Sequence, residues 1–496
     1  MKSNLYLALK EAARPRSKKV AVIYEREEIR FGELLEKIDA FAAFLSKQGI
    51  KNGDKAAILL KNTPEFIISA FACFKTGIVI VPLNFFLTTD ELIYILNDSR
   101  TVTLISNDGF SGHFSRIKEE VNNLKKIISW DDITPAEQGN GESYTGEEDI
   151  AAILYTSGTT GHPKGALLTH KNFISDVNSC LQVVAVKEKD RSLCFLPLFH
   201  SFAFTVCLLL PIFQGGSVVL LPKILKGSKF LKLIFSKKIT LFVSIPQVYK
   251  LFLKVPSLLG RIALWRVRYF VSGADALPEK VLQLFENKFK KSILEGYGLT
   301  EAAPVVTFNP PEKRKPGSIG KALPGVEVKI LDKDDNELPP NTIGELVIKG
   351  DNVMKGYFEY PEATKNTLKN GWLYTGDIAF SDEEGYIRIV DRKNDMFVCR
   401  GLNVYPREIE NILRDIPQIE EIAVIGEKLK EDTEVPVAFI KKNGEISREE
   451  IIAYCRKRIA NYKIPRNIFF VEDFPRTATG KISKKDIRKQ YPPDCG

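Results

Sequence analysis

The chain has 496 residues, of which 44% are hydrophobic, so it holds enough apolar material for several packed cores. Its 71 basic and 62 acidic residues leave a formal net charge of +9, a small surplus on a heavily charged surface. This surplus excludes the strongly basic balance of a nucleic-acid-binding protein and suits small polyanionic ligands. We therefore expect a globular, multidomain protein that binds small molecules and no nucleic acid.

Three features bear on the cellular compartment. The seven cysteines are scattered without C-x-x-C spacing, which favours reduced thiols over a metal or redox site. Residues 1–19 carry charges throughout and lack the apolar block of a signal peptide. The most apolar stretch, Phe202 to Phe213, is too short for a membrane span. We expect a cytoplasmic protein with no transmembrane segment, and peripheral contact with a membrane stays open.

Alternating strand and helix patterns in the N-terminal part predict a layered α/β core. Such sheets bind ligands in the loops that follow their strands. Helices are predicted at 31–48 and 64–76, and a further one begins at Leu277-Pro278. Strands are predicted at 55–60, 78–82, 150–155, 240–245, 267–271 and 292–294.

The helical pattern fades between residues 317 and 390, where alternation such as that of Val326 to Ile330 indicates antiparallel β structure. The last hundred or so residues have their own helix and strand patterns, enough for a small domain. The expected fold class is α/β. A large N-terminal domain, 1–391, would contain layered α/β subdomains and a β-rich subdomain, and a small C-terminal α+β domain would span 392–496.

The strand at 150–155 leads directly into a loop of mostly Thr, Ser and Gly that extends from Thr156 to Gly165. Glycines expose backbone N–H groups, hydroxyls add donors and Lys164 adds a positive charge, so this loop can enclose a phosphate. It is not a P-loop, because an apolar segment follows it and the next helix start is signalled only at Thr169. A solvated turn is the alternative interpretation. The expected phosphate-binding residues are Thr156, Ser157, Gly158, Thr159, Thr160 and Lys164.

The string Tyr155 to Gly165 resembles the signature of the acyl-adenylate-forming (AMP-binding) superfamily, which includes acyl-CoA synthetases, adenylation domains of peptide synthetases and luciferases. The resemblance covers essentially the whole chain. It implies that ATP activates a carboxylic acid as an acyl-adenylate, after which a thiol such as CoA takes the acyl group. It recurs in order at Tyr297 to Glu301, Tyr374 to Asp377, Asp391-Arg392, Gly401 to Glu408 and Pro475 to Lys481.

The second motif implies contacts with the nucleotide. By resemblance, Tyr297 stacks on adenine, Thr300 contacts the α-phosphate and Glu301 binds the Mg²⁺ that bridges the phosphates. A single glutamate is enough, because Mg²⁺ commonly takes one or two protein carboxylates beside substrate phosphates. Nucleotide contacts are also implied for Gly273, Ala274 and Gly298.

The later motifs imply the remaining nucleotide contacts and a moving domain. Asp377 would accept hydrogen bonds from the ribose hydroxyls, and Arg392 would pair with ribose or phosphate. Lys481 would bridge the substrate carboxylate and the α-phosphate, although a solvated basic tail is its alternative. The mobile C-terminal domain would pivot two positions after the hinge arginine, where the family commonly has Asp or Lys and this chain has Asn394. Gly401 would let the backbone approach CoA.

The acid is indicated by the segment Pro197 to Phe204, which resembles the family's acyl site. There His200 would gate the carboxylate end and Phe202 would line the pocket. The alternative interpretation of His200 is a core histidine whose ring nitrogens are hydrogen-bonded within the protein. Gly273, Ala274 and Asp275 would form a wall between acyl group and adenine. The run 297–310 is most like medium- and long-chain fatty acyl-CoA synthetases.

The resemblance therefore implies an AMP-forming fatty acid–CoA ligase of lipid metabolism, with acid, ATP and CoA as substrates and Mg²⁺ as cofactor. One alternative is an acyl-adenylate ligase that loads an acyl carrier protein. Another is a ligase for an aryl or other carboxylic acid. A binding module without chemistry is opposed by the retained Lys164, Glu301, Asp377 and Lys481.

Overall fold

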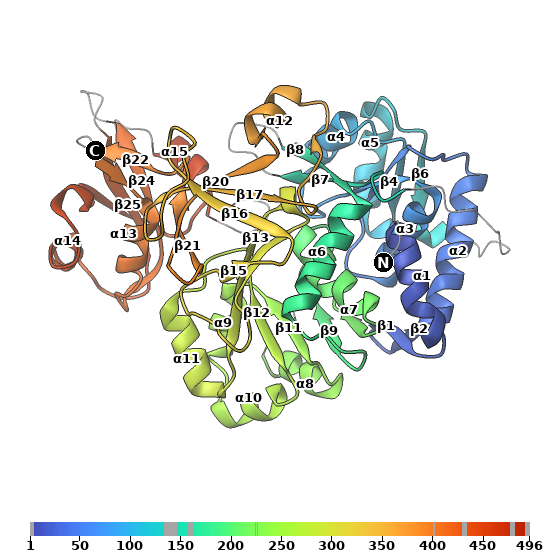
Figure 1. The fold of residues 1–496 in the computed structure, drawn as a ribbon, viewed down its shortest axis with the longest axis horizontal. Helices are drawn as coiled ribbons and strands as arrows, with labels where there is room; N and C mark the ends of the chain where they lie inside the picture. Colours follow the sequence, from blue (N-terminus) through green and yellow to red (C-terminus); the bar gives the residue numbers. More distant parts are fainter. Residues whose placement is uncertain are drawn as a thin grey trace. The chain divides into compact units, whose positions relative to one another are not determined.

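The computed structural model describes residues 4–132, 146–156, 163–223, 225, 227–399, 402–428, 434–476 and 482–491. The chain forms two compact units (Figure 1). The first comprises Met1–Val328 and Ile348–Leu373, and the second comprises Lys329–Val347 and Tyr374–Gly496. The expected limit between an N-terminal domain ending at 391 and a C-terminal domain starting at 392 stays a prediction.

A nine-stranded sheet forms part of the first unit, in the order β15-β14-β13-β12-β11-β9-β10-β1-β2. Its central strands are parallel, and β2, β14 and β15 near the edges pair in antiparallel fashion. The strands are β1 Val20–Tyr24, β2 Glu27–Arg30, β9 Arg191–Cys194, β10 Ser217–Leu220, β11 Leu241–Ser244, β12 Tyr269–Ser272, β13 Ile293–Gly298, β14 Val305–Phe308 and β15 Lys321–Ala322.

A seven-stranded sheet in the same unit has the order β18-β8-β7-β4-β3-β5-β6. Here β8 pairs antiparallel with both β7 and β18, and the other pairs are parallel. The strands predicted in both sheets are confirmed, with ends that shift by a few residues. The strands of this sheet are β3 Lys55–Ile58, β4 Val79–Pro82, β5 Thr103–Ser106, β6 Lys126–Ser129, β7 Ile150–Thr156, β8 Lys164–Thr169 and β18 Gly356–Tyr357.

The helices of the first unit begin and end at residues with suitable capping chemistry. Helix α3, Pro64–Thr76, has Pro at its first position and Gly77 in the left-handed conformation at its end. Thr169 caps α6 by accepting from Asn172 N, as predicted. The helix expected from Leu277-Pro278 begins instead at Glu279, because Pro278 keeps an extended backbone at the N-cap. The other α-helices are α1 Leu5–Ala13, α2 Phe31–Lys47, α4 Thr89–Asp98, α5 Phe114–Glu120, α6 His170–Val183, α7 Leu210–Phe213, α8 Ser228–Ser236, α9 Pro246–Phe252, α10 Ser257–Leu264, α11 Glu279–Phe289 and α12 Pro361–Thr367.

The apolar stretch at 202–213 forms a buried π-helix, η4 Ala203–Leu209, that continues into α7. Short 3₁₀ turns are η1 Arg14–Arg16, η2 Asp108–His113, η3 Trp130–Asp132, η5 Thr300–Ala302 and, in the second unit, η6 Asn461–Lys463. Within the described residues, no helix is both long enough and apolar enough to span a membrane. The six cysteines in these ranges are free and buried.

The β-rich part predicted after residue 317 is confirmed. Strands β16, β17, β20 and β19 follow one another in a sheet in which β21 pairs with β20. Their bounds are β16 Val326–Leu331, β17 Gly344–Gly350, β19 Leu368–Lys369, β20 Trp372–Ser381 and β21 Ile387–Arg392. The second unit continues with β22 Phe397–Cys399, β23 Leu402–Val404, α13 Pro406–Leu413, β24 Ile419–Lys428, β25 Glu434–Lys442, α14 Arg448–Arg456, β26 Asn467–Phe470 and α15 Lys484–Gln490. One apolar core joins α13 and α14 to the sheet β24-β25-β26.

Candidate active site

The residues predicted from the motifs fall in both units. Six of them lie outside the described residues, namely Ser157, Gly158, Thr159, Thr160, Gly401 and Lys481. The second unit holds Asp377, Arg392 and Asn394. The first unit holds Thr156, Lys164, His200, Phe202, Gly273, Ala274, Asp275, Tyr297, Gly298, Thr300 and Glu301.

The predicted phosphate loop is carried by the antiparallel strands β7 and β8. Thr156 and Lys164 lie directly opposite each other, so the two strands bring both ends of the loop together. Behind this pair, the Tyr155 hydroxyl donates to Asp98 Oδ2 at 2.6 Å. A side chain at Gly165 would clash with Ile153, since an added Cβ would lie 2.4 Å from its Cγ2. Close packing therefore requires this glycine at the start of the return strand.

Tyr357 connects the loop lysine to the predicted metal ligand, and the motifs did not identify it. Its hydroxyl donates to Glu301 Oε1 at 2.8 Å, and Lys164 Nζ lies 5.7 Å from its ring centroid. Burial and the negative charge of Glu301 raise the pKa of Tyr357, which keeps the hydroxyl protonated as a donor. Strand β18 places Tyr357 opposite Ala166, two residues after Lys164. The sequence signal that could have found it is the Gly356-Tyr357 pair, but nothing local links that pair to Glu301.

Thr300 and Glu301 lie in a tight turn between β13 and β14. The turn is closed by Leu299 N, which donates to Pro304 O at 3.0 Å. At Gly298 an added Cβ would lie 2.1 Å from the same carbonyl oxygen, so only glycine fits there. The Ser201 hydroxyl lies 3.5 Å from Thr300 Oγ1 and donates to it. This contact joins the predicted phosphate residue to the middle of the predicted acyl segment.

Buried side chains hold this turn from behind. Asn352 Nδ2 donates to Ala302 O and Val305 O, both at 3.0 Å. The Thr205 hydroxyl, on the π-helix, donates to Ala303 O at 2.9 Å. The backbone of Glu301 is fixed as well, since its carbonyl accepts from Met354 N at 2.8 Å. The turn is therefore fixed by contacts from residues far away in the sequence.

Asp176 of α6 adds a buried acid to the same support. Its Oδ2 accepts from Val305 N at 3.3 Å, and its Oδ1 has no hydrogen-bond partner. Burial raises the pKa of this carboxyl well above its ordinary value, which favours the neutral, protonated form. A neutral acid in this place supports the turn without adding negative charge behind Glu301.

The predicted acyl segment is anchored by Asn62. Its Nδ2 donates to Leu196 O at 2.8 Å and its Oδ1 accepts from Leu198 N at 2.9 Å. The ring of Phe202 packs against Gly273, where an added Cβ would lie 2.8 Å from the ring. The structure thus brings together two residues that the sequence assigned separately to the acyl pocket. His200 is half-buried, and its ring centroid lies 4.3 Å from the ring centroid of Phe199.

In the second unit, Asp377 and Arg392 face each other across strands β20 and β21. Arg392 Nε lies 2.7 Å from Asp377 Oδ1. The arginine side chain is 56% exposed, whereas the aspartate side chain is 4% exposed. Thr375 fixes the aspartate backbone by accepting from Asp377 N at 3.0 Å. Asn394 lies in the turn that follows Arg392. The ion pair therefore orients a buried carboxylate beside an accessible guanidinium.

Asp391 ties strand β21 to helix α13 within the same unit. Its two oxygens accept from Arg392 N at 2.7 Å and from Arg407 N at 2.8 Å. Burial raises the pKa of Asp391, although Lys484 and these two hydrogen bonds act in the opposite direction. The bonds to two backbone N–H groups fix the arginine of the Asp391-Arg392 motif relative to the helix.

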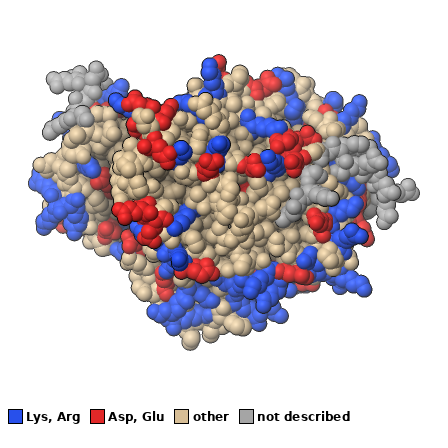
Figure 2. Space-filling view, in the orientation of Figure 1, with Lys and Arg blue, Asp and Glu red and all other residues tan. Residues whose placement is uncertain are grey.

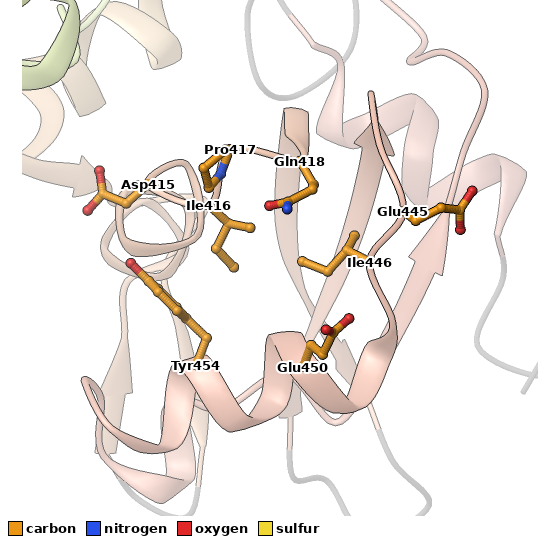
Figure 3. A pocket seen from close by; sticks show the side chains of 8 residues that line it. All are labelled: Asp415, Ile416, Pro417, Gln418, Glu445, Ile446, Glu450 and Tyr454. Carbon is orange, nitrogen blue, oxygen red and sulfur yellow. The ribbon is translucent and has the colours of Figure 1, made fainter.

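A hollow of about 250 Å³ in the second unit contains none of the predicted site residues. In Figure 3, Ile416 and Ile446 point into it, whereas the Glu445 carboxylate points away. Glu450, at its edge, accepts from Ser447 N and caps α14. This lining has a structural role in the helix cap and the apolar core.

Glu301 fits a magnesium ligand by the chemistry of its surroundings. Within the described ranges, no group of three or more His, Cys, Asp or Glu side chains could hold a metal ion. A cation here would need a single carboxylate together with oxygen ligands from a polyanion, which is a common arrangement for Mg²⁺. Glu301 supplies that carboxylate, and Tyr357 fixes one of its oxygens.

Comparison with known proteins gives consistent relatives. Residues 9–358 match the AMP-binding enzyme family, and residues 408–481 match the AMP-binding enzyme C-terminal domain. A long-chain-fatty-acid–CoA ligase of Escherichia coli O6:H1 is 31% identical over 94% of this chain and 90% of its own length. A 2-succinylbenzoate–CoA ligase of Bacillus velezensis is 34% identical over 95% of both chains.

Two solved structures share the fold along nearly the whole chain. ATP-bound MatB from Rhodopseudomonas palustris has a TM-score of 0.92, with 30% identity and 99% of both chains covered. O-succinylbenzoate coenzyme A synthetase (MenE) from Bacillus subtilis, in complex with ATP and a magnesium ion, has a TM-score of 0.89. It is 31% identical, and the match covers 98% of this chain and 100% of that one.

Proposed function

The chain belongs to the AMP-binding enzyme family, and from this premise we propose that it is a fatty acid–CoA ligase. The coarser activity is that of an AMP-forming ligase that joins a carboxylic acid to CoA through an acyl-adenylate. The finer part of the proposal is the fatty acid. Relatives of similar identity carry the names of both fatty-acid and 2-succinylbenzoate ligases, so identity alone does not select the acid.

The absence of charge in the predicted acyl segment carries the choice of a fatty acid. From Ser192 to Pro222 the sequence contains no Asp, Glu, Lys or Arg. Phe202 and Gly273 lie together in this region, and β11 ends at Ser244 with apolar residues before it. A dicarboxylic or succinylated acid has a second carboxylate that needs a cationic partner when it is buried. A fatty acid has no such group, so an uncharged lining suits it.

The reaction consists of two displacements. A carboxylate oxygen of the acid attacks the α-phosphorus of ATP, the bond to the β-phosphate oxygen breaks, and pyrophosphate leaves. The CoA thiol then attacks the carbonyl carbon of the acyl-adenylate, loses its proton, and AMP leaves with the bonding electrons. The mixed anhydride is needed because a carboxylate oxygen is a poor leaving group, whereas AMP is a good one.

The predicted site residues would orient the nucleotide in the first displacement. Thr156 and Lys164 would hold the phosphates at the ends of the loop, and Thr300 would donate to the α-phosphate. Lys481 is proposed to stabilise the charge that develops on the attacked phosphate. Asp377 would accept from the ribose hydroxyls, with Arg392 holding its carboxylate.

Mg²⁺ would be held by Glu301 and the phosphate oxygens of ATP, and it would neutralise charge on those phosphates. Tyr357 and Lys164 serve this arrangement from the protein side. The tyrosine hydroxyl orients the Glu301 carboxylate, and the lysine over its ring keeps a positive charge beside the phosphates. Asn394 as the hinge and Gly401 beside CoA complete the proposal for the second displacement.

An acid panel with two acceptors tests the function. The purified protein is incubated with ATP, Mg²⁺ and either octanoate, laurate, palmitate, 2-succinylbenzoate or malonate. CoA or a purified acyl carrier protein serves as acceptor, and AMP and thioester are measured by mass spectrometry. We expect thioester with the fatty acids and CoA. Thioester only with 2-succinylbenzoate or malonate would refute the fatty acid, and thioester only on the carrier protein would refute the CoA acceptor.

A further inference from the structure

The positive charge of the chain is concentrated in one stretch. From Arg191 to Ala274 the sequence contains 12 Lys and Arg residues and no Asp or Glu. The rest of the chain then has 59 basic and 62 acidic residues, so this stretch accounts for more than the whole net charge of +9. An acid-free run of this kind produces a positive field that nearby carboxylates do not cancel.

Four of these charges lie on three short helices, α8, α9 and α10, and another four follow those helices within two residues. Figure 2 shows Lys and Arg gathered along the lower edge of the view, where Figure 1 has α8 and α10. Helices α8 and α10 contact each other, and α10 also contacts α11. The exposed basic residues of this group are Lys223, Lys229, Lys232, Lys238, Lys250, Lys254, Arg261 and Arg266.

Large apolar side chains protrude among these charges. On α10, Leu258 and Leu259 are 69% and 57% exposed, and Trp265 just after the helix is 56% exposed. Residues 258, 259, 262 and 265 follow helical spacing and therefore share one outward face. We call these residues and the exposed basic residues above the α8–α10 surface. Its apolar members are Phe235, Leu251, Leu258, Leu259, Ile262 and Trp265.

The opposite face of α10 is fixed to the protein. Gly260 lies so close to α11 that an added Cβ would be 2.2 Å from the ring of Phe289. Ala263 and Leu264 are buried on that side. The protruding leucines are therefore held outward by a rigid support.

The charges around this face stay positive overall. Arg268 pairs with Asp190, the last acid before the stretch. Helix α11 brings Glu286, which pairs with Arg314, and also Lys288, whose ammonium donates to Leu253 O. Arg266 lies over the Trp265 ring, with its guanidinium carbon 4.4 Å from the ring centroid.

We propose that the α8–α10 surface binds an anionic lipid membrane. Protruding apolar side chains ringed by Lys and Arg match the two parts of a bilayer surface, because the former enter the acyl boundary and the latter meet anionic headgroups. An acidic protein partner would match the charge, but it would leave the most exposed leucines without a reason to protrude. The proposal does not depend on which acid the enzyme activates.

Vesicle binding tests the proposal with two variants of equal charge. The surface variant carries Lys229→Glu, Lys232→Glu and Lys254→Glu, and the control carries Lys47→Glu, Lys118→Glu and Lys125→Glu, all at exposed positions. Both change the net charge by the same amount. Co-sedimentation uses phosphatidylcholine vesicles with and without about 30% phosphatidylglycerol, at about 50 and about 500 mM NaCl.

We expect the native protein and the control to bind the anionic vesicles, with loss of binding at high salt. Each basic residue near an anionic surface strengthens binding about fivefold, so the surface variant should bind at least about a hundredfold more weakly. A Leu258→Ser, Leu259→Ser variant should also bind more weakly, and it should keep the thermal midpoint of the native protein. Trp265 emission should shift to shorter wavelength on binding.

Three results would overturn the proposal. Equal weakening by the control triple would show that net charge alone acts, without a defined surface. If the leucine variant bound anionic vesicles as strongly as the native protein, the leucines would not contact the bilayer. Binding of a purified acyl carrier protein to this surface, with no binding of anionic vesicles, would make it a protein-docking face.

Discussion

Replacement of Asn352 by Leu is expected to weaken the fold around Thr300 and Glu301. The side chain is 2% exposed, and its Nδ2 donates to Ala302 O and Val305 O at 3.0 Å each. Leucine has a similar volume and no donor. Each of the two buried carbonyls left without its donor costs about 1 to 3 kcal/mol, so the free energy of unfolding should fall by roughly 2 to 6 kcal/mol.

The same change should slow the first half-reaction. The two carbonyls belong to the turn that presents Thr300 and Glu301, and a misplacement of about 1 Å costs on the order of a hundredfold in rate. We expect kcat/KM for MgATP to fall by about ten- to a hundredfold at a temperature where the variant is folded. Urea unfolding and ATP–pyrophosphate exchange measure the two effects separately.

Asn309→Leu is the matched control. Asn309 is also 2% exposed, and its amide donates to Ser318 O at 2.7 Å and accepts from Lys315 N at 2.9 Å. Its loss should cost similar stability with little change in the exchange rate. The positioning role of Asn352 is refuted if its variant loses stability at an unchanged rate, or if the control loses as much rate.

Three further outcomes are expected. Lys481→Ala should abolish ATP–pyrophosphate exchange but keep appreciable thioester formation from a supplied acyl-adenylate and CoA; equal loss of both would contradict a role confined to adenylation. Tyr357→Phe keeps the ring near Lys164 but removes the donor to Glu301, so the Mg²⁺ concentration for half-maximal rate should rise about three- to tenfold; a lower rate with unchanged Mg²⁺ dependence would argue against this orientation. Burial lowers the pKa of His170 to about 4, so the folded state holds it neutral. This contribution to the free energy of unfolding is fully present above the unfolded pKa of about 6.5. As the pH falls toward 4, the free energy of unfolding should decrease by about 3 kcal/mol. Urea unfolding between these pH values should show this loss, and His170→Asn should lack it.

Local chemistry in the sequence was sufficient for most elements. Helix α3 has the predicted bounds because Pro64 suits a first turn and Gly77 can end it in the left-handed conformation. Thr169 was recognisable as an N-cap because its hydroxyl accepts a hydrogen bond from a backbone N–H only three residues ahead, that of Asn172. The start of α11 was misplaced because Pro is compatible with both the first turn and the N-cap, and only the backbone decides between them.

The sequence by itself determined the family resemblance and the fold class, and it predicted which residues carry the chemistry, because these depend on short strings and local periodicity. Only the tertiary structure decided what holds those residues. Tyr357 reaches Glu301, and Asn352 reaches Ala302, across fifty residues or more. Contacts between segments so far apart leave no spacing pattern in the sequence, and they arise only when the sheets bring these segments together. The outward face of α10 became visible for the same reason, since burial of Gly260 against Phe289 fixes which side of an apolar helix remains exposed.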